Sequence, residues 1–126
     1  MSKEIINSSE APAPIGPYNQ AVKAGNLLFI SGQIALDPRT GELKNGNIAE
    51  ETLQVLANLS AILKQAGMGF DHVVKSTIFL SDMSLFAEVN EIYAKVFPSD
   101  FPARETVAVK GLPRQVNVEI SMIASI

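Results

Sequence analysis

Two charged residues combine a side chain suited to chemistry with a position that would hold it in place. Arg104 follows Phe101-Pro102-Ala103, and the proline restricts the backbone just before an expected strand begins. The planar guanidinium carries donors that match a carboxylate in pairs, so Arg104 could clamp a carboxylic acid. A surface ion pair with a nearby glutamate is the alternative, because such pairs are common and contribute little.

Glu119 lies in the middle of the polar face of the last expected strand. Most glutamates on such a face are simply solvated. If other copies of the chain cover this face, burial would raise the pKa of the carboxyl, which suits a base or a water-positioning group near neutral pH. Tyr18 either covers the core or forms the wall of a site. Asn90 lies on the polar side of an expected helix, where it could also be merely solvated.

The rest of the sequence excludes several familiar kinds of site. One histidine, His72, and no cysteine leave little to hold a transition metal and rule out thiolate catalysis. Phe29-Ile30-Ser31-Gly32 lacks the glycine that a nucleophile elbow has two residues before its serine. No P-loop is present, and Gly67-Met68-Gly69 lacks the third glycine of a dinucleotide-binding loop. We therefore expect no metal and no organic cofactor, and a site built from arginine, carboxylate, tyrosine and backbone groups.

Composition bounds the class of protein. A chain of 126 residues suits one domain over 1–126, and 47% hydrophobic against 18% charged residues is typical of a folded chain. So few charges cannot cover that much apolar surface in so small a domain. Part of the apolar surface should therefore be buried against other copies of the chain.

Charge and hydropathy exclude two classes of partner. The net charge is −3 and the ten Lys and Arg residues are scattered, whereas nucleic-acid binding needs a basic face. No segment is apolar over a length that spans a bilayer, and the first seven residues contain no apolar core of a signal peptide. We expect a cytoplasmic protein that binds neither nucleic acid nor membrane.

Hydrophobic periodicity predicts six strands and two helices. Asn47 is a good N-cap for the first helix, with Glu50 three positions on as in a capping box, and Gly67 is placed to end it. The second helix has possible caps within 81–84 and stops at Pro98. The strands are expected at 5–6, 20–24, 27–36, 73–80, 104–110 and 115–125. Strands joined through helices imply parallel pairings, with both helices on one face of the sheet.

The last strand is the most informative element. Its apolar residues alternate with polar ones, so one face should meet the helices and the other should stay open or face another subunit. The apolar set is Val116, Val118, Ile120, Met122, Ala124 and Ile126. The polar set is Gln115, Asn117, Glu119, Ser121 and Ser125, with Ile123 as the exception.

Seven segments, in the same order and spread over nearly the whole chain, resemble the reactive-intermediate deaminase family, also called Rid or YjgF. They are 13–20 (APIGPYNQ), 30–34 (ISGQI), 74–83 (VKSTIFLSDM), 89–93 (VNEIY), 102–104 (PAR), 112–113 (LP) and 118–120 (VEI). A match of this extent is much more specific than any single motif among them.

The resemblance implies an α+β fold like that of chorismate mutase, with two helices packed on one face of the sheet. It also implies a homotrimer with three equivalent clefts between subunits. The implied reaction is deamination of enamine and imine acids, which pyridoxal-phosphate-dependent dehydratases release. The substrates would be 2-aminoacrylate, 2-iminopropanoate and 2-iminobutanoate, and the products 2-keto acids and ammonia.

The resemblance also implies roles for individual residues. By family role, Arg104 would clamp the substrate carboxylate, and Glu119 would position or activate the water that attacks the imine carbon. The groups that would orient the substrate or line the cleft are the backbone around Gly32 and Thr106 and the side chains of Tyr18, Ser31 and Asn90.

The sequence departs from the family pattern directly after the arginine. The family often has Ser and then Cys, whereas this chain has Glu105 and Thr106. Thr106 keeps the backbone contact but brings no thiol. Glu105 should point to the opposite face from Arg104 in a regular strand and so spare the site. If a bulge turned it inward, it would compete with substrate for Arg104.

Two other functions are compatible with parts of this pattern. A trimer with arginine-lined clefts could bind keto acids and regulate a partner without turnover, but such a sensor needs no carboxylate beside its arginine. A ribonuclease or translation inhibitor is the second alternative, because this activity is ascribed to some relatives. The acidic charge and the absence of a basic patch argue against it.

Overall fold

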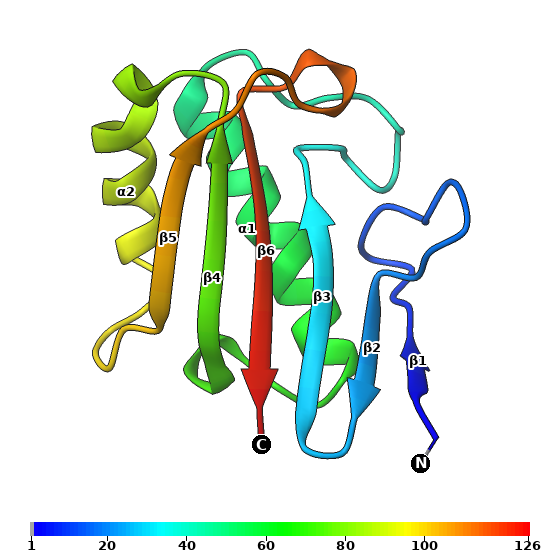
Figure 1. Cartoon of the computed structure of the whole chain (residues 1–126). Coiled ribbons are helices and arrows are strands. Elements are labelled where there is room, and N and C mark those ends of the chain that lie inside the picture. Colours follow the sequence, from blue (N-terminus) through cyan, green and yellow to red (C-terminus); the bar gives the residue numbers. More distant parts are fainter. Residues whose placement is uncertain (1) are drawn as a thin grey trace.

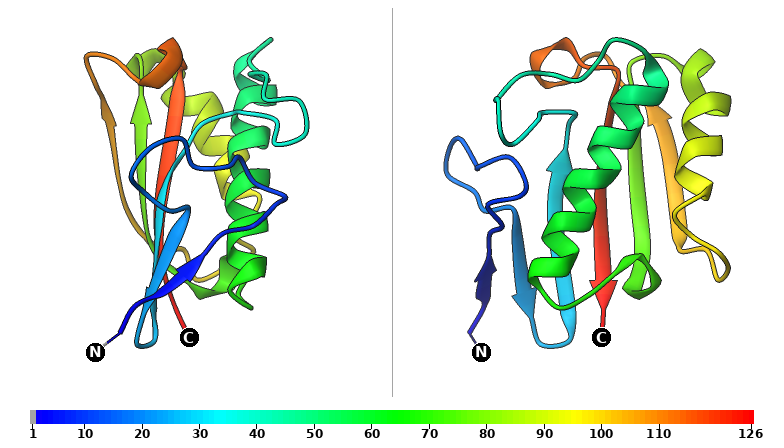
Figure 2. Two further views of the ribbon diagram at one scale, coloured as in Figure 1. Left: turned by 90° about the vertical axis from the view of Figure 1, so that its right-hand side faces the viewer. Right: turned by 180° about the vertical axis from the view of Figure 1, so that it is seen from behind.

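Residues 2–126 are described by a computed structural model, in which one six-stranded sheet carries two α-helices on a single face (Figures 1 and 2). Met1, part of the expected span 1–126, lies outside the described residues. The strands are β1 (Glu4–Ile6), β2 (Ala21–Ala24), β3 (Leu27–Gln33), β4 (Val73–Leu80), β5 (Ala103–Ala108) and β6 (Val118–Ser125). The helices are α1 (Ile48–Gln65) and α2 (Phe86–Ala94), and single 3-10 turns lie at Phe70–His72, Met83–Leu85 and Pro113–Gln115. The α+β prediction is confirmed.

The last strand of the chain lies inside the sheet rather than at its edge. The strand order is β1-β2-β3-β6-β4-β5, and β6 pairs antiparallel with both β3 and β4. β5 pairs parallel with β4, as expected for strands joined through a helix. The expected parallel pairing of β3 with β4 is wrong, because β6 lies between these two strands. The position of β6 between β3 and β4 depends on contacts between segments far apart in the chain, so the local sequence does not predict it.

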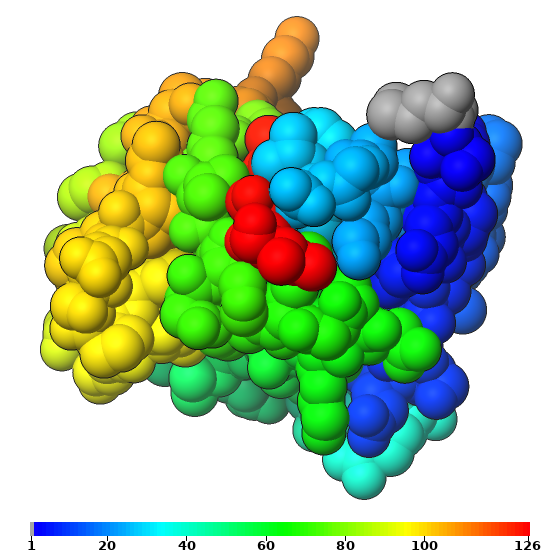
Figure 3. Space-filling view, turned by 90° about the horizontal axis from the view of Figure 1, so that it is seen from below, coloured from blue at the N-terminus to red at the C-terminus, as the bar shows by residue number. Residues whose placement is uncertain are grey.

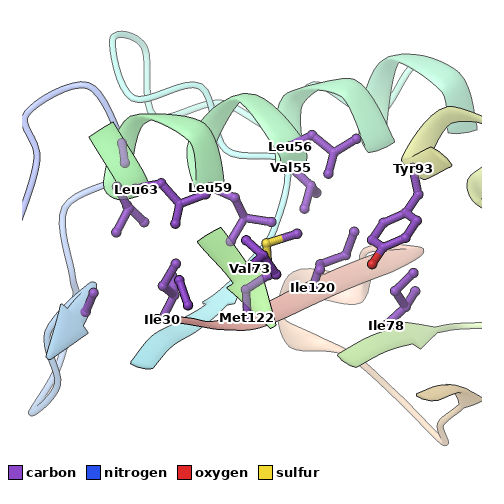
Figure 4. Close-up of a cluster of buried hydrophobic side chains, with 14 of the residues drawn as sticks. Ile30, Val55, Leu56, Leu59, Leu63, Val73, Ile78, Tyr93, Ile120 and Met122 are labelled. Atoms are coloured by element: carbon purple, nitrogen blue, oxygen red, sulfur yellow. The ribbon is translucent and has the colours of Figure 1, made fainter. Parts of the chain in front are cut away.

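The apolar face of β6 packs against α1, as its alternation predicts. Val118, Ile120, Met122 and Ala124 are all buried. Figure 4 shows the facing layer of α1, which is made of Val55, Leu56, Leu59 and Leu63. Each large aliphatic side chain removed from water in this way contributes about 1.5–3 kcal/mol to folding. This layer fixes the orientation of β6, so Glu119 must point to the other side of the sheet.

The end of β6 differs from the expected pattern. Ile126 is 65% exposed although its number places it on the apolar face, because the strand ends at Ser125. The backbone N–H of Ile126 donates to the carbonyl of Asn26 at 3.0 Å. Figure 3 accordingly shows the C-terminal end of the chain, in red, beside the β2–β3 hairpin, in light blue.

The helix boundaries follow their capping residues. Asn47 is the N-cap of α1, and its Oδ1 accepts from the Glu50 N–H at 2.8 Å. Gly67 follows the helix with a φ of 74°, a left-handed conformation that favours glycine at this position. α2 is shorter than its apolar spacing predicts, because its first turn is the 3-10 turn at Met83–Leu85 and it ends at Ala94, before Pro98. Neither helix of residues 2–126 has the length and apolar character that crossing a membrane requires.

The second face of the sheet has no helix over it (Figure 2). The alternation of β6 predicts this uncovered face. It carries Glu119 and Glu105, but it also exposes large apolar side chains. Leu27 and Phe29 on β3 and Val107 on β5 are each at least 40% exposed. An uncovered face of this mixed character is where contact with other copies of the chain would be most favourable.

Candidate active site

A cavity of about 510 Å³ contains four of the expected site residues, Tyr18, Ser31, Gly32 and Glu119. It forms where the proline-rich loop before β2, the end of β3 and the turn before β6 meet. The remaining lining residues are Pro12, Ala13, Ile15, Gln20, Gln33, Ile34, Leu36, Pro113 and Arg114. Much of the wall is apolar, and the carboxylate of Glu119 is partly removed from water in this cavity.

Glu119 is held at this cavity by a close approach to Gly32. A Cβ built on Gly32 would overlap Oε2 of Glu119 and lie 2.9 Å from its Cδ, so only glycine leaves room for the carboxylate. Glu119 is half-buried, and this burial raises the pKa of its carboxyl above the ordinary glutamate value. The carboxyl therefore has the character of a group that can exchange a proton closer to neutral pH.

Gly32→Ala is expected to push the Glu119 carboxylate into solvent while the fold survives. The backbone of Gly32 is not left-handed, so alanine fits there, and the clash falls on the flexible end of a side chain. We expect the Glu119 pKa to fall towards its ordinary value and the free energy of unfolding to change by less than about 1 kcal/mol. NMR titration of the Glu119 carboxyl carbon and thermal unfolding measure the two effects.

Gly111→Ala is the matched control, because a Cβ at Gly111 meets no atom within 4 Å. It should leave the Glu119 titration unchanged. The same Glu119 pKa in Gly32→Ala and in the unsubstituted protein would contradict the close-approach argument.

Hydrogen bonds hold the proline-rich loop over the cavity. Gln20 is 1% exposed, and its amide donates to the carbonyls of Ser8, Ala11 and Pro12 and accepts from the Ser8 N–H at 2.6 Å. Ser31 Oγ donates to the Asn19 carbonyl at 2.7 Å, which connects the loop to β3. Tyr18 is 51% exposed, so it forms a wall of the cavity and does not cover the core.

Arg104 lines a separate cavity of about 440 Å³ at the α2 side of the molecule. Its Nη1 donates to Oδ1 of Asn90 at 2.7 Å, so Asn90 is a partner of the arginine rather than a merely solvated residue. The guanidinium carbon lies 5.1 Å from the Tyr93 ring centre and 5.7 Å from the Phe86 ring centre, which favours the cation. Within residues 2–126 no carboxylate lies within ion-pair distance of Arg104, so the surface ion pair is not observed.

The two residues after Arg104 point to opposite sides of β5. Glu105 points to the uncovered face, where hydrogen bonds from Thr77 and then Lys75 hold its pKa below the ordinary value. It does not compete for Arg104, which confirms the expectation for a regular strand. Thr106 shares the face of Arg104, and its Oγ1 is buried without a hydrogen-bond partner among residues 2–126.

Arg104 and Glu119 lie on opposite faces of the sheet within one chain. Arg104 is level with Ser76 of β4, which is buried on the helix side and bonds to Tyr93 Oη at 2.8 Å. Glu119 is level with Phe79, an odd number of residues further along β4, and so points the other way. β4 also separates the two strands. A single chain therefore does not bring the guanidinium and the carboxylate together.

One charged residue of the Glu119 cavity, Arg114, was not predicted from the sequence. Arg114 lines the Glu119 cavity, and both Arg114 and Gln115 have a positive φ, 54° and 56°. Neither residue is glycine, so no sequence signal marks this strained turn. Elsewhere in residues 2–126, no three His, Cys, Asp or Glu side chains gather where they could hold a metal ion.

Comparison with known proteins shows to which family the chain is related. Residues 8–126 match the family model described as endoribonuclease L-PSP. The chain belongs to this family, which is also called the YjgF or Rid family. A RutC family protein of Pyrococcus horikoshii is 52% identical over 122 residues, which are 97% of each chain. The mouse 2-iminobutanoate/2-iminopropanoate deaminase is 48% identical over 122 residues, which are 97% of this chain and 90% of the mouse protein.

Solved structures show the same fold for Rid proteins. The crystal structure of the Rid family protein YyfA from Yersinia pestis superposes with a TM-score of 0.97 at 44% identity, and the match covers 99% of this chain and 100% of that one. The YjgF-like arrangement of two helices on a mixed sheet is thereby confirmed. Family members carry different names, deaminase and endoribonuclease among them, so membership leaves more than one activity to weigh.

Proposed function

We propose that this Rid family protein is an imine deaminase. It would hydrolyse 2-aminoacrylate, 2-iminopropanoate and 2-iminobutanoate to 2-keto acids and ammonia in the cytoplasm. The observation that carries the proposal is the half-buried carboxylate of Glu119 over Gly32, whose pKa is raised by burial. The name of the mouse relative, 48% identical, supports the same reaction.

The proposed reaction needs water to add to the carbon of the C=N bond, and then ammonia to leave. Glu119 would accept a proton from the attacking water as the water oxygen bonds to the imine carbon, and it would pass this proton to the nitrogen. The remaining hydroxyl proton of the adduct would then move to the nitrogen, so that ammonia can leave. Collapse of the adduct breaks the C–N bond and leaves a C=O bond. A positioned base of this kind typically contributes about 10²–10⁴-fold to the rate.

Arg104 would hold the substrate carboxylate during these steps. Its contacts with Asn90 and two aromatic rings orient the guanidinium before substrate arrives, which lowers the entropy lost on binding. The backbone around Gly32 and Thr106 would orient the substrate, with Tyr18 and Ser31 forming the wall on the Glu119 side.

We further propose that each site forms between two copies of the chain in a homotrimer. Arg104 and Glu119 occupy different cavities on opposite faces, so a site that uses both residues needs a second chain. β5, which carries Arg104, is the edge strand of the sheet and is free to approach another copy. The exposed apolar side chains of the uncovered face give the contact a hydrophobic driving force.

Mixed trimers test the shared site. Arg104→Ala and Glu119→Gln should each be nearly inactive, but a mixture of the two should recover activity after subunit exchange. In random trimers, about a quarter of the sites would combine one intact Arg104 with one intact Glu119. No recovery in mixed trimers isolated with two affinity tags, or a monomer by light scattering at micromolar concentration, would contradict the shared site.

Two other functions fit the structure less well. A ribonuclease, the activity in the family description, would need cationic groups along a nucleic-acid path, but the net charge is −3 and the Lys and Arg residues are scattered along the chain. A keto-acid sensor would use Arg104 but gains nothing from a base. A keto-acid sensor does not account for a carboxylate with a raised pKa in the cavity. A ribonuclease could use such a base, so the acidic net charge is the argument against it.

The experiment that tests the function couples the purified protein to a dehydratase acting on serine or threonine. Serine supplies 2-aminoacrylate and threonine supplies the four-carbon enamine, which tautomerise to imines and decay slowly in water. We expect the protein to accelerate the decay of the intermediate and the appearance of keto acid. Unchanged decay at protein concentrations equal to those of the dehydratase would overturn the proposal, and cleavage of RNA would favour the ribonuclease.

A further inference from the structure

Glu51 is a carboxylate buried in the first turns of α1, with an exposed fraction of 0%. All hydrogen bonds of its side chain go to Asn117 and Val118, where β6 begins, 66 and 67 residues further along the chain. Oε2 accepts from the backbone N–H of Asn117 at 2.7 Å and of Val118 at 3.1 Å, and Oε1 accepts from Asn117 Nδ2 at 2.9 Å. Three donors converge on one carboxylate, which compensates its burial.

Stability alone is a weak reason for this arrangement. A buried ionic group often contributes no more to the free energy of unfolding than an apolar side chain of similar size. The main effect of these contacts is to fix the position of the backbone. They fix Asn117 and Val118, the two residues directly before Glu119, against a helix packed on the opposite face of the sheet.

The segment held by Glu51 is one that would otherwise be poorly constrained. It follows the turn in which Arg114 and Gln115 both adopt a positive φ, a conformation that costs on the order of 1–3 kcal/mol per residue. Asn117 is held from the other side by Ser81, whose N–H donates to the Asn117 carbonyl at 2.9 Å. Glu51 and Ser81 thus hold the start of β6 from two directions.

Glu119 is sensitive to a shift of this segment towards Gly32, because its carboxylate has no free space on that side. It lies against Gly32 so closely that a single added methyl group would displace it. A displacement of about 1 Å at a reacting group can lower a rate by about 10²-fold. If Glu119 is the reacting base, the start of β6 has to be held more exactly than folding alone requires.

We propose that Glu51 is a positioning residue, which holds the carboxylate of Glu119 over Gly32 by fixing the backbone of Asn117 and Val118. The inference rests on the proposed deaminase function in giving Glu119 a chemical task. The position of the Glu119 carboxylate, however, can be measured without turnover.

Glu51→Gln is the principal variant. Its amide nitrogen would face the donor Nδ2 of Asn117, which repels it unless the Asn117 amide rotates and gives up the bond that its Oδ1 accepts from Ser81 Oγ. We expect kcat for imine hydrolysis to fall by about 10–100-fold with little change in KM, measured well below the unfolding temperature. The Glu119 pKa, followed by NMR titration of its carboxyl carbon, should fall towards the ordinary value as the carboxylate moves into solvent.

Two further variants separate positioning from folding. Thr52→Val removes a buried hydroxyl that bonds within α1 to the Ile48 carbonyl at 2.8 Å, so it should lower thermal stability without changing kcat or the Glu119 titration. The double variant Glu51→Gln with Asn117→Asp exchanges donor and acceptor across the same contact. It should restore most of the lost kcat and the raised Glu119 pKa.

Asn117→Ala covers the case in which Glu51→Gln does not fold. It removes only the side-chain donor and leaves both backbone bonds to Glu51, and Ser81→Ala is its control for the lost contact with Ser81 Oγ. We expect a smaller loss of kcat than in Glu51→Gln and a Glu119 pKa that shifts in the same direction.

A folded variant of Glu51 or Asn117 with unchanged kcat and unchanged Glu119 pKa would overturn the positioning role. The same holds if Thr52→Val lowers kcat as much as Glu51→Gln does. If the unsubstituted protein hydrolyses no imine, the deaminase proposal fails, and the Glu119 titration alone then decides the role of Glu51.

Discussion

Arg104→Lys should lose most imine hydrolysis although it keeps the positive charge. Arg104 already donates to Asn90 at 2.7 Å, lies over the rings of Tyr93 and Phe86 and lines the cavity, and its planar guanidinium has further donors for a carboxylate. A lysine ammonium is a point charge that cannot bond to Asn90 and clamp a carboxylate bidentately at once. Truncating one partner of a hydrogen-bonded charge pair costs roughly 2–5 kcal/mol, so kcat/KM should fall by about 30- to 5,000-fold.

The matched control is Arg39→Lys, the same chemical change in an exposed loop outside both cavities of the site. It should leave turnover unchanged. Light scattering and thermal unfolding should report an intact assembly for both variants, because neither side chain belongs to the buried core. Normal kcat/KM in Arg104→Lys would mean that any nearby cation suffices, and the bidentate clamp would then be wrong.

The fold follows from the sequence wherever the deciding contacts are local or periodic. The alternation along β6 predicts both its buried face and the uncovered one, because neighbouring side chains in a strand point to opposite sides. Asn47 and Gly67 mark the ends of α1 because capping satisfies backbone groups within one turn. The placement of β6 between β3 and β4 could not be predicted in this way, because it depends on contacts between segments far apart in the chain.

The candidate site is predictable as a set of residues but not as a geometry. Strand alternation assigns Arg104 and Glu119 to faces of their own strands, yet the relation between those faces needs the registers of β4 with β5 and β6. The contacts of Glu51 with Asn117 and Val118 could not be predicted from the sequence either. From the sequence, its position near the start of a helix predicts only a favourable interaction with the helix dipole. An exposed glutamate at that position could make the same interaction. Its burial and its bonds to β6 appear only in the folded chain.

Glu119→Gln should lower imine turnover by about 10²–10⁴-fold, the contribution typical of a positioned base. The amide fills nearly the same volume over Gly32 but cannot accept a proton from water. Binding of a keto acid should change much less, because the clamp at Arg104 interacts with substrate and product nearly equally and so contributes to affinity more than to rate. Glu42→Gln, at an exposed loop position, is the control for loss of a negative charge.

The pH dependence gives an independent readout of the same residue. A base must be ionised to act, so turnover should fall as the pH drops through the Glu119 pKa. Burial raises that pKa, so the acidic limb of the rate profile should lie at higher pH than an exposed glutamate would give. The residual activity of Glu119→Gln should show no such acidic limb in its pH–rate profile, because no carboxyl remains at this position to titrate.

Calorimetric binding of a keto acid, together with single-turnover decay of the imine, distinguishes the roles that Glu119 could have. A large loss of rate with nearly unchanged affinity is the result expected for a base. If rate and affinity fall together, Glu119 contributes to binding or structure, and the keto-acid sensor gains support. If neither changes, hydrolysis would depend on Arg104 and backbone donors alone, and the raised pKa of Glu119 would have no part in the reaction.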